Sequence, residues 1–157
     1  MGPAMERVAE LGRLPMDWAT YGAGPPTSLS VEAAHRLLTK VNDMWGRTFG
    51  QAIQPFVVVP LPRGGLQVEW RNDAAEIEIE IGPDGQVGYL FIDKTGDERV
   101  FQEEDDVSWD DALATIERVF VLGQERGSLV AVQERRADNR RDLATALAIA
   151  QEAGAYD

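Results

Sequence analysis

A strict alternation of isoleucine and glutamate in residues 75–81, AEIEIEI, limits what this chain can fold into. Successive side chains of a β-strand point to opposite faces, so the isoleucines share one face and the glutamates share the other. The two sets are Ile77, Ile79, Ile81 and Glu76, Glu78, Glu80. The pattern therefore predicts a strand with one buried face and one polar face.

The same period of two continues through the surrounding segments. FVVVP, LQVEWR, QVGYLFID and RVFQEE are short β-prone runs, and turn-forming stretches such as RGG and GPDG separate them. QVGYLFID is apolar on both faces, which indicates a central position. The spacing predicts an antiparallel β-meander of four to five strands over residues 55–103.

Helical periodicity flanks the meander on both sides. Residues 28–46 carry an apolar stripe at helical spacing, and Ser28 or Ser30 is the expected N-cap. Residues 108–157 are predicted to form C-terminal helices that begin at Ser108 and are separated around Gly123 and Gly127. The expected inward-facing residues of the last helix are Leu143, Ala146, Leu147 and Ile149 or Ala150.

Residues 1–27 are expected to form a short helix and an ordered loop, in which Trp18 and Tyr21 lie against the core. With 157 residues, the whole chain is predicted to be a single α+β domain, with helices packed on one face of the sheet.

Composition excludes several classes of site. The chain has no cysteine, which removes disulfides, thiol nucleophiles and cysteine-based metal sites, and its single histidine, His35, removes multi-histidine sites. No apolar run reaches the length of a membrane span, and the N-terminus lacks a signal-peptide pattern. We therefore expect a cytoplasmic protein with no membrane association.

The net charge of −12 comes from the central region. Residues 66–111 hold 15 of the 27 acidic residues and only three basic ones, while the rest of the chain is balanced. Such a field repels phosphate groups, so direct nucleic-acid binding is not expected. A basic partner or a cation fits such a field, and another protein is the expected partner.

The glutamate row allows several interpretations. With Glu69 on the neighbouring strand, Glu76, Glu78 and Glu80 could form the solvated face of a sheet, a docking face, or a carboxylate site for a metal-assisted hydrolase. A metal-dependent nuclease also needs a nearby lysine, and Lys94 lies outside this strand.

Other charged and glycine-rich stretches indicate no cofactor. The acidic run of residues 103–111 lacks a calcium-loop pattern, and the glycine turns match no nucleotide-binding motif, so no metal or cofactor is predicted. A basic cluster is interleaved with acids near the C-terminus and could be solvated, bind an anion, or contact a second subunit, which makes a homo-oligomer an alternative. Its members are Arg135, Arg136, Arg140 and Arg141.

A set of motifs in residues 18–89 resembles a loose group of small uncharacterised bacterial proteins. The motifs are W-x-x-Y-G-A-x-P-P before a helix, P-x-x-G-G-L-Q-V-E-W, and an EIEI…DG hairpin. The resemblance implies a bacterial cytoplasmic protein with a helix on a β-meander, and it implies no activity and no catalytic residue.

These observations together predict a non-enzymatic, acidic protein-interaction module, either antitoxin-like or regulatory. The alternatives are a metal-assisted hydrolase that uses the strand carboxylates and an acidic mimic of nucleic acid. The predicted interaction face comprises Glu69, Glu76, Glu78, Glu80, Arg135, Arg136, Arg140 and Arg141.

Overall fold

The structure is a computed structural model that describes residues 2–19 and 22–154, without the side chains of residues 128–132 and 150–154. It divides into two units, residues 1–123 and 124–157. In chain order the elements are α1 (Pro3–Leu11), α2 (Ser28–Phe49), the 3₁₀ helix η1 (Gly50–Ile53), β1 (Val57–Pro60), β2 (Leu66–Arg71), β3 (Ala75–Ile81), β4 (Val87–Asp93), β5 (Val100–Glu104) and α3 (Trp109–Gly154).

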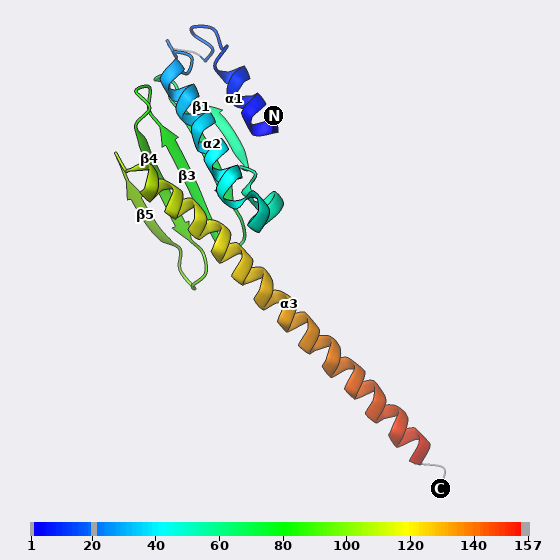
Figure 1. Ribbon diagram of the computed structural model, residues 1–157. Coiled ribbons are helices and arrows are strands. Elements are labelled where there is room, and N and C mark those ends of the chain that lie inside the picture. Colours follow the sequence, from blue (N-terminus) through cyan, green and yellow to red (C-terminus); the bar gives the residue numbers. More distant parts are fainter. Residues whose placement is uncertain (1, 20–21, 155–157) are drawn as a thin grey trace. The chain divides into compact units, whose positions relative to one another are not determined.

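The sheet is an antiparallel meander of five strands in the order β1-β2-β3-β4-β5. Each strand pairs with the one that precedes it in the chain, and β4 lies between β3 and β5 as its two apolar faces predicted. Helix α2 and the first turns of α3 cover the same face of the sheet (Figure 1). The predicted α+β class, with an antiparallel meander and helices on one face, is confirmed.

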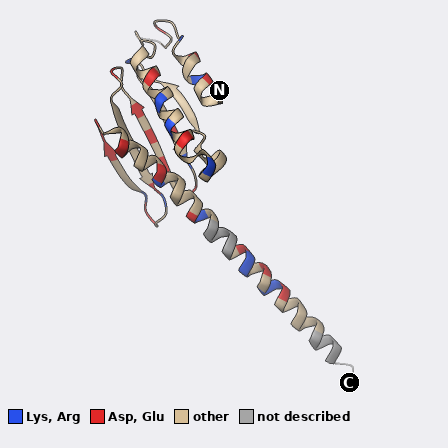
Figure 2. Ribbon diagram, in the orientation of Figure 1, with Lys and Arg blue, Asp and Glu red and all other residues tan. Residues whose placement is uncertain are grey.

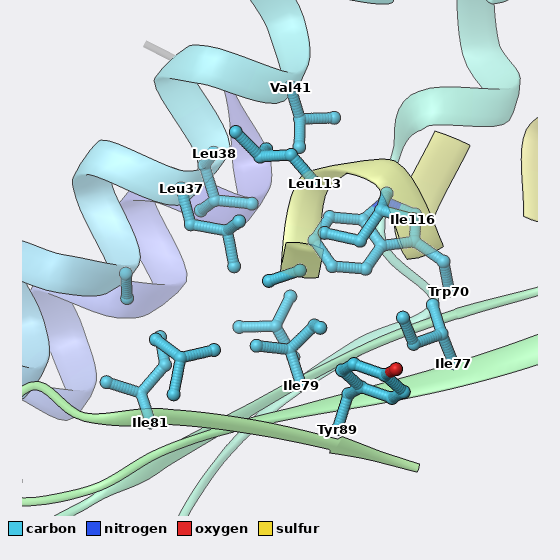
Figure 3. Packing of buried hydrophobic residues seen from close by; sticks show 14 of the residues in the cluster. Leu37, Leu38, Val41, Trp70, Ile77, Ile79, Ile81, Tyr89, Leu113 and Ile116 are labelled. Carbon is cyan, nitrogen blue, oxygen red and sulfur yellow. The ribbon is translucent and has the colours of Figure 1, made fainter. Parts of the chain in front are cut away.

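The core forms between that face and the helices. Ile77, Ile79 and Ile81 are fully buried, and Figure 3 shows them pointing toward Leu37 and Leu113 of the helices. Burying one such side chain contributes roughly 1.5–3 kcal/mol. In residues 75–81, the isoleucine face of β3 is therefore the face that packs against the helices.

The N-cap of α2 is Thr27, not Ser28 or Ser30 as the sequence suggested. The Thr27 hydroxyl accepts a hydrogen bond from the Ser30 amide at 3.1 Å, and its backbone is extended. Ser30 is fully buried instead, with its hydroxyl 2.9 Å from the carbonyl oxygens of Thr27 and Gly64. A serine two residues inside the helix thus ties the helix start to the β1–β2 turn. The predicted start of the next helix at Ser108 is confirmed, because α3 begins at Trp109 and the Ser108 hydroxyl accepts a hydrogen bond from the Asp111 amide.

Asn72, in the turn after β2, holds that turn against α3. Its side-chain oxygen accepts hydrogen bonds from the amides of Ala74 and Ala75, and its side-chain nitrogen donates to the Val119 carbonyl oxygen at 2.9 Å. A Cβ atom at Gly123 would meet this amide group. Only glycine, which has no Cβ atom, leaves room for Asn72 in this turn of α3.

The predicted separation of the C-terminal helices at Gly123 and Gly127 is wrong, because α3 continues through both glycines. A glycine inside a helix lowers its stability by only about 1 kcal/mol, so it does not by itself end the helix.

The second unit is described as a helix up to Gly154. Every described side chain from residue 124 onward is exposed, including Leu143 at 68% and Leu147 at 58%. The prediction that Leu143, Ala146, Leu147 and Ile149 face inward is therefore wrong, whereas Ala150 and Tyr21 lie outside the described side chains. Helical spacing identifies an apolar stripe but does not show whether another element covers it.

Candidate functional site

The face of the sheet that points away from the helices carries the glutamate row. Strand register places Glu78 beside Glu69 on one side and Leu90 on the other, and Leu90 beside Glu103. We call this surface the open face, and on strands β2 to β5 it comprises Gln67, Glu69, Arg71, Glu76, Glu78, Glu80, Gly88, Leu90, Ile92, Phe101 and Glu103. Figure 2 shows the acidic residues along these strands.

Two of the glutamates on the open face have polar partners. The Gln67 side chain donates a hydrogen bond to Glu69 at 2.6 Å. Lys94 forms an ion pair with Glu76 at 3.1 Å and also donates to the Asn72 carbonyl oxygen. Lys94 is distant in sequence from β3, and the strand register brings it to the end of the glutamate row.

Three carboxylates of the open face have no such partner. Arg71, the nearest arginine on β2, stacks its guanidinium on the Phe56 ring at 3.2 Å from the ring centroid. Within the described part of the chain, the side chains of Glu78, Glu80 and Glu103 make no hydrogen bond and no ion pair. The negative charge at the centre of the open face is therefore uncompensated.

Glu78 lies at the centre of this charge. Its partial burial raises the pKa of the carboxyl, and the neighbouring charges of Glu69, Glu76 and Glu80 raise that pKa further. Both causes disfavour the ionised form, so the folded protein is less stable with Glu78 charged than it would be with a neutral side chain there.

Glu78→Gln is therefore expected to stabilise the protein at pH 7. Removing a like charge directly opposite Glu69 should raise the free energy of unfolding by about 0.5 kcal/mol. Because the folded state holds the Glu78 proton more tightly than the unfolded state, this difference should shrink as the pH falls through the raised pKa of Glu78.

Urea denaturation of both proteins at pH 7 and at about pH 4 tests this expectation. The difference in unfolding free energy between the two proteins reports the contribution of Glu78, because every other titrating group is common to both. Asp93, for example, has a pKa lowered by its hydrogen bonds from Thr95 and acts in the opposite direction. A variant that is less stable than the wild type at pH 7 would contradict the expectation.

A small hollow lies at the edge of the carboxylate group. It has a volume of about 100 Å³ and forms over Gly88, which carries no side chain. Its walls include Glu78, Glu80, Glu103 and Asp105. Across the described residues, however, no three Asp, Glu or His side chains form a group that could hold a metal ion.

Apolar side chains adjoin the carboxylates. Phe101 is 61% exposed, Leu90 is half-buried and Ile92 is buried, all on the open face. Phe101 and Glu103 were not among the residues predicted for this surface. The alternation of side chains along β5 puts Phe101 and Glu103 on the same face of that strand. Only the register with β4 shows that this face is the open face.

The predicted arginines belong to the second unit. Arg135, Arg136, Arg140 and Arg141 lie on α3 and are exposed, and Arg141 lies 3.9 Å from Asp138 in an ion pair along the helix. The glutamates belong to the first unit, so the residues of the predicted interaction face are divided between the two units.

No helix in the described part of the chain combines the length and the apolar character needed to cross a membrane. The chain matches no protein-family model, no curated protein and no solved structure.

Proposed function

We propose that the protein is a non-enzymatic protein-interaction module that binds a basic segment of a partner chain on its open face. The resemblance to bacterial proteins suggests a bacterial cytoplasm as the setting, and the acidic face suggests an antitoxin-like or regulatory role there. Binding of this kind masks the partner's basic surface and weakens as the salt concentration rises.

One observation supports this proposal above the others. Glu78 lies directly opposite Glu69 without a cation at its own carboxylate within the described residues, and exposed Phe101 lies on the same face. A purely solvated face would be more stable with mixed charges and fewer exposed aromatic rings. An arrangement that lowers stability in this way is typical of a binding surface.

The carboxylates give less support to a metal-assisted hydrolase. Such a site needs carboxylates that converge on one ion, whereas Glu76 is engaged by Lys94 at 3.1 Å. The described residues also offer no acidic group arranged to hold a metal.

The experiment is affinity purification of the tagged protein from its own host at low salt, followed by mass spectrometry. We expect the variant Glu78→Gln, Glu80→Gln, Glu103→Gln to lose a partner that the wild type captures. The matched control removes three exposed charges elsewhere, by Asp43→Asn, Glu98→Gln and Glu117→Gln.

The proposal requires a partner that the control keeps and the open-face variant loses. A partner that both variants retain, or that both lose, would show that the open face is not the binding surface. Capture of no protein by the wild type at low salt would also contradict the proposal.

A further inference from the structure

One stripe of the helical second unit combines arginine with leucine. Arg136, Arg140, Leu143 and Leu147 follow one another at spacings of four, three and four residues, which places them on one side of a helix. All four side chains are exposed. We call this set the Arg–Leu stripe.

The acids of the same segment lie on the opposite side. Glu134, Asp138 and Asp142 recur every four residues and are about half a turn away from the Arg–Leu stripe. The stripe itself contains no acidic residue. It therefore presents positive charge and apolar surface together, and a ligand for it must be acidic and apolar.

The open face has this complementary character. The hollow over Gly88 is lined by Glu78, Glu80, Glu103 and Asp105, and it can accept a guanidinium group, whose five N–H donors match carboxylate oxygens. Leu90 and the exposed Phe101 lie farther along the same face.

The spacings of the two surfaces also agree. Along β4, the hollow at Gly88 is four residues from Ile92, which pairs with Phe101, a distance of about 13 Å. On the helix, Leu147 is about 10 Å from Arg140 and about 16 Å from Arg136. Arginine can thus reach the hollow while leucine contacts Phe101.

We infer that the partner of the open face is a second copy of this chain, whose Arg–Leu stripe docks there. Arg136 and Arg140 bind the carboxylates around Gly88, and Leu143 and Leu147 cover Leu90 and Phe101. The inference rests on the proposed function, because it uses the same open face. Because the occupant is a second copy held partly by charge, the protein is expected to self-associate at low salt, where screening is weakest.

Light scattering of the full chain in about 20 mM and about 500 mM salt tests the inference. The wild type should form a dimer or larger assembly at low salt and dissociate at high salt. Arg136→Gln with Arg140→Gln should weaken association about tenfold, because two charge pairs are lost. Arg135→Gln with Arg141→Gln removes the same charge off the stripe and should leave association unchanged.

A charge exchange makes the test specific. One variant carries Arg136→Glu and Arg140→Glu, and the other carries Glu78→Lys and Glu80→Lys. Each should be monomeric alone, whereas the mixture should associate, because each helix then meets a sheet of opposite charge. Circular dichroism and urea denaturation check that both variants are folded.

Three outcomes would overturn the inference: a monomeric wild type at low salt, equal association of the stripe and off-stripe variants, or no association in the mixture. A monomeric wild type that still captures another protein through Glu78, Glu80 and Glu103 would leave the proposed function standing with a different partner. Failure of both experiments would remove the open face as a binding surface.

Discussion

Ile79→Ala is expected to lower the free energy of unfolding by about 2–5 kcal/mol. Ile79 is fully buried at the centre of β3, and its cross-strand neighbours Val68 and Tyr89 are buried as well. Removing three carbon atoms there leaves a cavity that strands paired on both sides cannot easily close. A loss of this size is a large part of the stability of an ordinary domain.

Urea denaturation followed by circular dichroism measures this loss, and the next residue provides a matched control. Glu80 is on the same strand but exposed on the open face, so Glu80→Ala should change stability by no more than about 0.5 kcal/mol. Equal losses in the two variants would contradict the assignment of the isoleucines to the core and of the glutamates to the open face.

Gly123→Ala is expected to lower stability by about 2 kcal/mol, although alanine is the better helix former. The new Cβ atom would meet the side-chain amide of Asn72. Moving that amide breaks its hydrogen bonds to Val119, Ala74 and Ala75, each worth about 1 kcal/mol. These losses exceed the gain of about 1 kcal/mol in helix propensity.

Gly127→Ala provides the control, because among the described residues no atom outside the adjoining helix backbone lies within 4 Å of a Cβ built at Gly127. This substitution should not lower the unfolding free energy, and the helix signal in circular dichroism should hold or increase. A double-mutant cycle adds a second check, since Gly123→Ala should cost much less in an Asn72→Ala background. An equal cost in both backgrounds would contradict the role of Asn72.

Part of the candidate site could be predicted from the sequence. The alternation of residues 75–81 is enough to place Glu76, Glu78 and Glu80 on one face, because the side-chain period of a strand is two. The ion pair of Glu76 with Lys94 and the position of Glu103 could not be predicted in this way. Both depend on the register between strands, which pairing and turn geometry determine.

The C-terminal region shows a different limit. The apolar spacing of Leu143 and Leu147 predicts a helix with an apolar stripe, and the structure has the helix. The same spacing led to the wrong expectation that the stripe is buried. Burial depends on a neighbouring element, and an amphipathic pattern is the same whether that element belongs to this chain or to a partner.

The sequence by itself determined the order of the elements, the α+β class and the two-faced character of β3. These follow from local periodicity and turn chemistry, which short stretches of chain carry on their own. Only the tertiary structure decided that Thr27 caps α2, that Gly123 is needed for Asn72, and that the hollow over Gly88 gathers acids from β3, β5 and the residue that follows β5. The capping bond of Thr27 is local, but Ser30 is drawn to Gly64 instead of capping the helix, and the other two features likewise depend on contacts between residues far apart in the chain. Such contacts exist only once the strands have paired and the helices have packed on the sheet.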